Sequence, residues 1–579
     1  MNILEQTDAI TPPITGRRDV TTRDQSLFVP EMQRSELAIA LLIFTVTALY
    51  LYLFRRYTEM DPDEGIVLQG AHRILNGQVL YRDFFSFFTP GSYYLLALVF
   101  RIFGDSLLAA RSVLVFFGAV YSAITYLLAR RVGSRNAALF VAVIVTLTTL
   151  PYRFLVLHNW DSTFWACLAV YCAVRLLESP RWGWALAVGS LTSITFLFEQ
   201  SKGAGMALGL GAGFVALALL GKRGLWRGQT LLALASGSLW PVFLCLAYFG
   251  TQHALSPMLA DWFWPLHHYS LANRVPYGYP NWSDLARHQM FGSGPWGVRL
   301  VTAVAVSPCF MITLLPLFAI GWLGYWLWQS WRRRAADAKS AYYILTSAAI
   351  CGLLLSVIVV RTDNIHFVYL QPLFCLALAW LVDGRDVPGR IFKSLHPLFN
   401  AYVAIAFLLL AMPLLLRSTN LPTRIETRRG AITAPKDDTV IPYVQAHVTP
   451  GEAFLVYPYL PLYNYLTDTV SPSRFEYFQP GMSTPEQARE IISQLAARHV
   501  RAVLLEPGFG NKISTSWPNT PIGTIANDPI VDSILHDYRS CRILTSTNDL
   551  IFLFMMRKDL PCPTASTTEQ KKEEKTESR

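Results

Sequence analysis

The sequence predicts an all-α polytopic membrane domain of about eleven transmembrane helices, followed by a small C-terminal α/β domain. The first observation is composition: 53% of the 579 residues are hydrophobic and only 15% are charged, against about 25% charged in soluble domains. The second is a series of apolar runs close to the length of about 20 residues that a helix needs to cross a bilayer. The third is a change to ordinary soluble patterning after residue 420.

The expected membrane domain covers residues 37–419 and is preceded by a polar cytoplasmic segment, residues 1–36. Its predicted spans are 37–54, 107–129, 137–151, 162–177, 182–198, 203–221, 229–250, 301–328, 341–360, 366–382 and 397–416. Because the polar N-terminus is no cleavable signal peptide, the first span is expected to be an uncleaved anchor. The piece 91–104 is apolar but too short to span easily.

Orientation follows from lysine and arginine, which concentrate in cytoplasmic loops. With the N-terminus inside, the basic loops 129–135, 178–181, 221–228, 329–339 and 383–393 all fall inside. Arg55 and Arg56, at the outer end of the first span, oppose the rule. The net charge of +10 is then mainly the signature of this topology and does not indicate a nucleic-acid partner.

The C-terminal domain is expected over residues 420–563, outside the cytoplasm, with a low-complexity, disordered tail over 564–579. Residues 452–457 and 500–506 read as strands, and 484–499 reads as an amphipathic helix with Thr484 as N-cap. Cys541 and Cys562 could pair in an oxidising compartment, although the sequence leaves this open. The other six cysteines lie in or near spans and are expected to be small apolar fillers.

Mixed-charge polar residues gather on the predicted outer face, each close to the end of a span. They are Asp61, Asp63, Glu64, Arg73, Asp83, His158, Asp161, Glu199, Lys202, Arg361, Asp363 and His366. Ionisable side chains at membrane depth are costly and are usually functional. This one-sided distribution predicts an enzyme or receptor that works at the outer surface, since a carrier should place polar residues along the whole path.

The acids that follow the first span have a structural and a catalytic interpretation. Asp61 suits a helix N-cap, Pro62 the first helical position and Glu64 the third, as in a capping box, and Gly77 would end the helix. Asp63 has no capping role and could act as a base at the boundary between water and lipid. The sequence does not decide between the two interpretations.

Other polar groups also have two interpretations. Glu199 and Lys202 are spaced as a helical ion pair, or Lys202 holds a phosphate. Arg361 and His366 are candidate phosphate partners, and Arg361 could instead be a snorkelling anchor. Asp161 beside His158 is either an N-cap or a site residue. The aromatic loop 261–282 is an interfacial belt or a platform for sugar rings or a lipid tail.

The opening polar stretch resembles a known family. "PDEG" (62–65), "AHRILNGQVLYRDFF" (71–85), "TPGSYYLLALVFRIFG" (89–104) and "SLLAARS" (106–112) resemble the first outer loop and second span of membrane glycosyltransferases of the GT-C class. The similarity is to family 39 and polyprenyl-phosphate-sugar-dependent members, relatives of protein mannosyltransferases and of the lipid A aminoarabinose transferase. "RTDNIHFVYLQP" (361–372) resembles a late element of the bacterial branch, so the resemblance covers roughly residues 37–382.

The resemblance implies an inverting glycosyltransferase that uses a sugar on a polyprenyl phosphate and an acceptor hydroxyl at the outer face of a bacterial plasma membrane. A loop acid, carried over to Asp63 with Asp61 as the competing candidate, would take the proton, and Glu64 would orient the site or bind the acceptor. The leaving phosphate would need cations, for which Lys202, Arg361 and His366 are the candidates, chosen mainly by their position in the sequence. Further candidate substrate-binding residues are Arg73, Tyr81, Arg82, Asp83, His158, Asp161, Glu199 and Asp363. The sequence requires no cofactor, although the acids could hold a divalent metal.

Other functions remain open from the sequence. A transporter or flippase of a lipid-linked sugar is the main alternative, but it predicts charges buried along its spans. A non-catalytic receptor would not need the scattered outer-face charges, and a polysaccharide polymerase or ligase would share the donor type. The sugar and the acceptor, which could be a lipid, a glycan or a protein, are not determined by the sequence.

Overall fold

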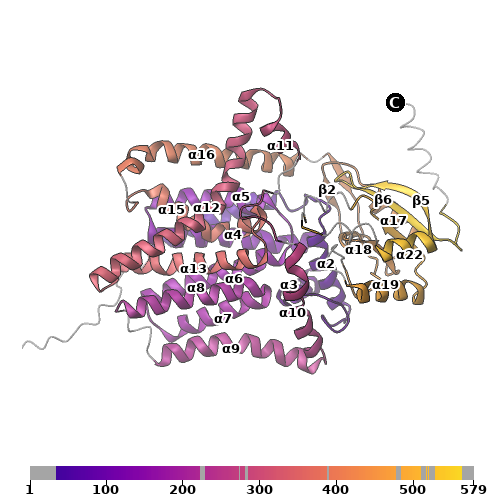
Figure 1. Ribbon diagram of the computed structural model, residues 1–579, viewed down its shortest axis with the longest axis horizontal. Coiled ribbons are helices and arrows are strands. Elements are labelled where there is room, and N and C mark those ends of the chain that lie inside the picture. Colours follow the sequence, from indigo (N-terminus) through magenta and orange to yellow (C-terminus); the bar gives the residue numbers. More distant parts are fainter. Residues whose placement is uncertain are drawn as a thin grey trace, which may run out of the picture.

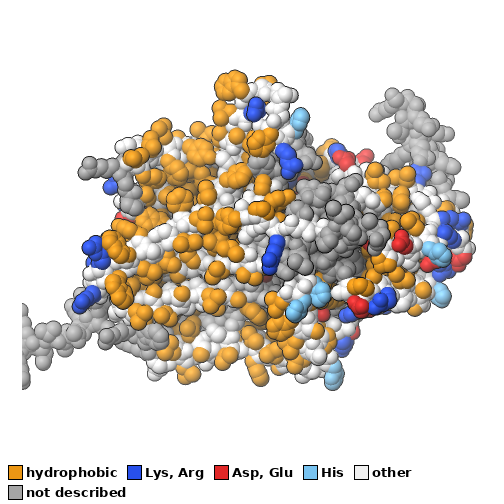
Figure 2. Space-filling model, in the orientation of Figure 1, with side chains coloured by type: hydrophobic (Ala, Val, Ile, Leu, Met, Phe, Trp, Pro, Cys, Tyr) orange, Lys and Arg blue, Asp and Glu red, His pale blue; other side chains and the backbone are white. Residues whose placement is uncertain are grey.

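The computed structural model shows a helix bundle with a small sheet-containing region at one end (Figure 1). It describes residues 34–221, 228–272, 274–280, 284–387, 390–420, 422–476, 484–509, 517, 519–520 and 528–563. Hydrophobic side chains cover the visible face of the bundle, and charged side chains gather toward its two ends and on the sheet region (Figure 2). Most of the expected segment 1–36 and the tail 564–579 lie outside the described residues.

Ten of the eleven predicted spans each fall on one helix, whereas the predicted span 366–382 is divided between α14 (Asn364–Tyr369) and α15. These helices are α1 (Arg34–Tyr52), α4 (Leu107–Val132), α5 (Arg135–Tyr152), α6 (His158–Glu178), α7 (Trp182–Phe198), α8 (Gln200–Leu219), α9 (Gly228–Thr251), α12 (Trp296–Arg333), α13 (Ala338–Val360), α15 (Gln371–Asp383) and α16 (Arg390–Thr419). Among the described residues, eight helices are long and apolar enough to cross a membrane. Helices α7 and α15 are shorter, and α6 carries several polar residues in its first turns, so the count of eleven spans stays a prediction.

Shorter helices connect the long ones. They are α2 (Pro62–Leu75), α3 (Gly91–Phe103), α10 (Leu255–Ala272), α11 (Asp284–Phe291) and α14 (Asn364–Tyr369). Helices α2, α3 and α10 lie at the end of the bundle that faces the sheet region (Figure 1). The apolar piece 91–104 therefore forms helix α3, which with 13 residues is about 20 Å long, shorter than the hydrocarbon core.

Small residues allow α8 and α13 to pack closely. A Cβ atom added to Gly352 on α13 would lie 2.1 Å from the carbonyl oxygen of Gly205 and 2.8 Å from Cα of Gly209, both on α8. Glycine-rich interfaces let helix backbones approach in membranes. This contact fixes the position of α8, whose first turn carries Lys202.

The sheet region contains the secondary structure predicted for it. Strands β3 (Phe454–Tyr457), β4 (Ala502–Leu505), β5 (Tyr538–Thr545) and β6 (Ile551–Arg557) form a sheet of order β3-β4-β6-β5, and β1 (Thr423–Ile425) pairs with β2 (Ile432–Ala434). Its helices are α17 (Val440–His447), α18 (Leu462–Thr467), α19 (Pro485–Ala497) and α22 (Pro529–Asp537). Strands β3 and β4 are parallel, as expected for a strand–helix–strand unit. Thr484 caps α19 in a capping box with Gln487, so both predicted strands and the predicted helix are confirmed.

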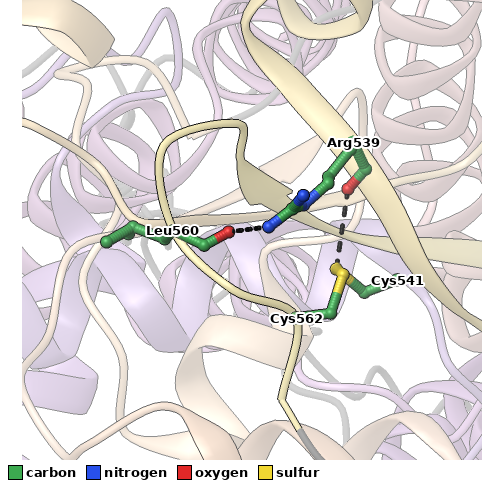
Figure 3. Close-up of a disulfide and its surroundings, with 4 residues drawn as sticks. All are labelled: Arg539, Cys541, Leu560 and Cys562. Carbon is green, nitrogen blue, oxygen red and sulfur yellow. Dashed lines mark hydrogen bonds between the residues drawn. A yellow bond between two sulfur atoms is a disulfide. The ribbon is translucent and has the colours of Figure 1, made fainter.

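A disulfide joins Cys541 and Cys562 (Figure 3), which settles the pairing that the sequence left open. Cys541 lies in β5, and Cys562 follows β6 near the end of the described chain. A guanidinium nitrogen of Arg539 also donates to the carbonyl oxygen of Leu560. Both contacts hold the segment after β6 against the sheet.

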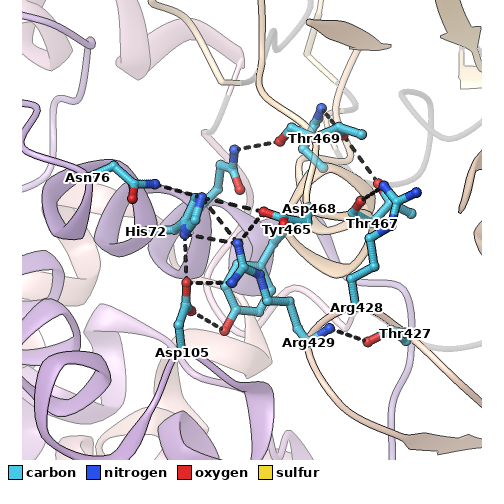
Figure 4. Close-up of polar contacts among 12 residues, drawn as sticks. His72, Asn76, Asp105, Thr427, Arg428, Arg429, Tyr465, Thr467, Asp468 and Thr469 are labelled. Atoms are coloured by element: carbon cyan, nitrogen blue, oxygen red, sulfur yellow. Dashed lines mark hydrogen bonds and ion pairs between the residues drawn. The ribbon is translucent and has the colours of Figure 1, made fainter. Parts of the chain in front are cut away.

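A polar cluster connects the bundle to the sheet region (Figure 4). His72 Nδ1 lies 2.6 Å from Asp105 Oδ2, and Arg429 Nη1 lies 2.8 Å from the same oxygen. The hydroxyl of Tyr465 donates to Asp105 Oδ1 at 3.0 Å. Burial raises the pKa of Asp105, but the bond to His72 and the charge of Arg429 outweigh burial and hold the pKa below its usual value.

Candidate active site

Helix α2 begins as the sequence predicts. Asp61 is the N-cap and accepts a hydrogen bond from the backbone N–H of Asp63 at 3.0 Å, and Pro62 occupies the first turn. The helix ends at Leu75, and Gly77 follows with a positive φ of 88°. The predicted capping box is wrong in one respect, because the carboxylate of Glu64 does not return to the N-cap.

Glu64 instead forms a buried ion pair with Arg111 of α4. Arg111 Nε and Nη2 donate to the two carboxylate oxygens at 2.9 and 2.6 Å, and both side chains are 0% exposed. The backbone N–H of Val156 adds a third bond at 3.0 Å. These contacts fix α2 against α4 and against the segment before α6. Both carboxylate oxygens of Glu64 are therefore engaged within the protein.

Arg153, at the C-terminal end of α5, bridges the other two acids. Its Nη2 lies 2.8 Å from Asp61 Oδ2 and 2.9 Å from Asp63 Oδ2. The hydroxyl of Tyr459, from the sheet region, donates to Asp63 Oδ1 at 2.9 Å. The Asp63 side chain is 42% exposed, whereas that of Asp61 is 20% exposed. Asp63 is therefore the more accessible of the two carboxylates.

The environment of Asp61 raises the pKa of its carboxyl group. Burial is the largest effect and raises the pKa of Asp61 to about 6, while the charge of Arg153 lowers it and those of Asp63 and Glu64 raise it. A carboxyl group of this kind titrates close to the physiological range. The ionisation state of Asp61 therefore affects the strength of its ion pair with Arg153.

The "RTDNIH" stretch forms a second charged group. Asp363 caps α14, accepts from the backbone N–H of His366 at 3.1 Å and lies 2.6 Å from His366 Nδ1. Arg361 also pairs with Asp363. Burial raises the pKa of Asp363, but His366 and Arg361 outweigh burial and keep the carboxyl well below its usual pKa. The carboxylate therefore holds the side chains of Arg361 and His366 in place.

The two groups converge around Tyr369 and His158. Charges of Arg153, Asp63, Asp61 and Asp363 act on the buried Tyr369 side chain. The Tyr369 ring meets the His366 ring edge-on, with centroids 5.9 Å apart. His158 lies within electrostatic reach of Asp63 and His366, and also of Glu199 and Lys202. The structure thus brings together residues as far apart in the sequence as Asp61 and Tyr369.

Lys202 is enclosed and not open to solvent. Its Nζ lies 2.9 Å from Glu199 Oε2, 2.8 Å from the carbonyl oxygen of Asn159 and 3.0 Å from Ser162 Oγ. The residue is 2% exposed, and these bonds use the three donors of its ammonium group. The helical pair that the spacing predicts is confirmed, and Lys202 joins α8 to α6.

The remaining predicted residues lie apart from this group. Arg73 is buried and bonds to Gln78, Asp83 and Glu476, and Arg82 pairs with Asp83 at 2.9 Å. Tyr81 is buried, and its hydroxyl donates to the carbonyl oxygen of Phe88 at 2.8 Å. These contacts shape the chain between α2 and α3 and attach it to the sheet region.

Two structural alternatives from the sequence are also tested. Asp161 is not an N-cap, because α6 begins at His158 with Leu157 as the preceding residue; Asp161 is buried within the first turn. In the aromatic loop, Trp262 donates to the Tyr81 hydroxyl at 2.8 Å, and Trp264 stacks on Phe87 with centroids 5.5 Å apart. Both Trp side chains therefore contact protein.

Four residues of the site were not predicted: Arg111, Arg153, Tyr369 and Tyr459. Arg111 could have been identified from the sequence, because an arginine inside a predicted span usually has a partner or a function. Arg153 could also have been identified, because it follows a predicted span on the predicted outer face, where the other candidate residues lie. In the part of the chain that the structure describes, no three His, Cys, Asp or Glu side chains are grouped to hold a metal ion.

Residues 89–249 match the model of the family described as dolichyl-phosphate-mannose-protein mannosyltransferase. The family resemblance is confirmed. The matched segment holds Arg111, Arg153, His158, Glu199 and Lys202, whereas the acids at 61–64 precede it. No curated protein sequence matches the chain.

The chain is also similar to solved structures of other proteins. The oligosaccharyltransferase of Archaeoglobus fulgidus, tethered to an acceptor peptide, is 13% identical, with a TM-score of 0.48 over 90% of this chain and 74% of that one. ArnT from Cupriavidus metallidurans, bound to undecaprenyl phosphate, is 12% identical, with a TM-score of 0.48 over 92% of this chain and 99% of its own. At these scores the similarities add no argument about the chemistry.

Proposed function

We propose that this chain is a membrane glycosyltransferase that moves a sugar from a polyprenyl-phosphate donor to an acceptor hydroxyl at the outer face of the membrane, with inversion. The observation that carries the proposal is the accessible carboxylate of Asp63, held by Arg153 and Tyr459 at the end of the bundle. The match to the mannosyltransferase family supports the reaction class. The membrane-spanning helices support a donor carried by a lipid.

In the proposed reaction, Asp63 acts as the general base. The acceptor oxygen forms a bond to the anomeric carbon, the bond from that carbon to the phosphate oxygen breaks, and the acceptor proton passes to Asp63. Asp61 is less suited to this role, because its carboxylate already caps α2 and is the less exposed of the two. A positioned base contributes about 10²–10⁴-fold to such a step.

The phosphate leaves with the bonding electron pair and needs cations to stabilise its charge. We assign this role to Arg361 and His366, which Asp363 holds in place. The phosphate would share their donors with that carboxylate. Lys202, with its donors occupied by Glu199 and α6, becomes a positioning residue that keeps His158 beside the site.

The test is transfer of labelled sugar from a panel of polyprenyl-phosphate sugars by the purified full chain in bilayers. Asp63→Asn should lower the transfer rate by about 10²–10⁴-fold while leaving the folded protein intact. The matched control is Asp549→Asn, because Asp549 is an exposed acid of the sheet region that pairs only with exposed Lys436 among the described residues.

The alternatives are separated by the same assay. Full activity of Asp63→Asn with loss of activity in Asp61→Asn would move the base to Asp61. Movement of the intact labelled lipid across the bilayer, with no transfer from any donor, would favour a transporter or flippase and contradict the proposal.

A further inference from the structure

A groove of about 500 Å³ lies on the outside of the bundle, between the outer end of α1 and helices α3 and α4. Its lining includes Arg55, Phe103, Ser106, Ser112, Val113 and Phe116. The volume lies in the range of small-molecule sites. None of the residues described above for the candidate active site lines it.

The walls of the groove belong to the surface that faces lipid. Phe103 and Phe116 are 74% and 49% exposed although both are large and apolar. Leu53, which follows α1, and Ile102 on α3, next to Phe103, are also largely exposed. Apolar side chains that point outward at the end of a spanning helix are suited to hydrocarbon chains and not to water.

The polar end of the groove is cationic. Arg55 Nη1 donates to Ser112 Oγ at 3.3 Å and Nη2 donates to the hydroxyl of Tyr52 at 2.9 Å, both neutral partners. No carboxylate of the described chain forms an ion pair with Arg55, and its buried Nε has no hydrogen-bond partner there. The positively polarised N-terminus of α4, capped by Ser106, opens into the same groove. The groove therefore offers positive charge without a compensating acid.

The sequence marks the same residue as unusual. Arg55 opposes the rule that arginines near spans lie on the cytoplasmic side. An arginine on the outer side is stabilised if it pairs with a lipid phosphate, since guanidinium groups bind phosphate oxygens in a bidentate manner.

We propose that this groove binds a phospholipid of the outer leaflet, with its phosphate on Arg55 and its acyl chains along Phe103 and Phe116. The occupant is a bilayer lipid and not the sugar donor, because successive residues of α4 separate the two sites. Ser112 contacts Arg55, whereas Arg111 turns inward to the fully buried Glu64. The inference does not depend on the proposed function.

The experiment is native mass spectrometry of the full chain released from nanodiscs that contain an anionic phospholipid such as phosphatidylglycerol. The wild type should retain one phospholipid more than Arg55→Gln does. The matched control is Arg56→Gln, because Arg56 is the adjacent arginine, is exposed and does not line the groove. The hydrogen bonds from Thr433 go to the backbone carbonyl oxygen of Arg56, which the substitution keeps. Arg56→Gln should retain as much lipid as the wild type.

Equal retention by Arg55→Gln and Arg56→Gln would overturn the proposal. Titration with polyprenyl phosphate distinguishes the two kinds of lipid. If one equivalent of polyprenyl phosphate displaces the retained phospholipid, the groove is the donor site and the proposal is overturned. Retention of both lipids together supports two separate sites. Asp63→Asn should keep the phospholipid, so failure of the proposed transferase activity would leave this result unaffected.

Discussion

Replacing Glu64 by Gln should lower the free energy of unfolding by about 3–5 kcal/mol. Both Glu64 and Arg111 are 0% exposed, and Arg111 makes two bonds to the carboxylate. The variant keeps the size of the side chain but leaves the guanidinium charge buried without a carboxylate. Removing one member of a buried pair is costly, because the remaining charge has lost its compensation and cannot reach water.

The measurement is reversible unfolding of the purified protein in mixed detergent micelles, with the denaturing detergent as the variable. The matched control is Glu426→Gln, which breaks the pair between Arg424 and Glu426; these side chains are 64% and 69% exposed. Exposed pairs contribute about 0–1 kcal/mol, so this control should be nearly neutral. The double variant Glu64→Gln, Arg111→Met should recover part of the loss, since it removes the uncompensated charge.

A loss for Glu64→Gln no larger than that for Glu426→Gln would contradict a large contribution of this buried pair to stability. It would mean that the charge of Arg111 is compensated by its other acceptors, the carbonyl oxygen of Tyr57 and the hydroxyl of Thr58. Helix α2 would then be held mainly by its apolar contacts.

Two further predictions concern the acids and the contact between the two parts of the chain. Because the pKa of Asp61 is raised to about 6, the carboxylate that holds Arg153 is protonated as pH falls through about 6, and kcat should fall with it. The pH profile of Asp61→Asn should lack this acidic decrease in kcat. An unchanged decrease in the variant would assign it to another group. Arg429→Met removes a cation from Asp105 and Asp468 and should lower the free energy of unfolding by about 2 kcal/mol. Amide hydrogen exchange should then become faster in β1 and β2. Unchanged exchange would contradict a role for this cluster in attaching the sheet region to the bundle.

Patterns that are local in the chain could be predicted from the sequence. The long helices follow from runs of apolar residues, because a helix satisfies its own backbone groups in lipid. The start of α2 at Asp61 follows from the chemistry of helix capping. The β3–α19–β4 unit follows from alternation and from the cap at Thr484, all of which lie within about 50 residues.

The partners of the acids could not be predicted in the same way. Glu64 has the spacing of a capping box. Its carboxylate instead accepts two hydrogen bonds from the buried guanidinium group of Arg111, 47 residues away. Lys202 looked like a phosphate ligand because its charge lies near a span end. Its burial against Glu199 and α6 depends on the close packing of α8 on α13 through Gly205, Gly209 and Gly352.

Local patterns in the chain were enough to predict which segments are apolar, where the main helices and two strands lie, and that the mixed charges gather at one end of the spans. These properties depend on residues that are neighbours along the chain. The packing of the folded chain was needed to show that Arg153 joins Asp61 to Asp63 and that Tyr459 contacts Asp63 from the sheet region. Those contacts join residues about 90 and 396 positions apart, and they depend on how helices pack, which no local pattern encodes.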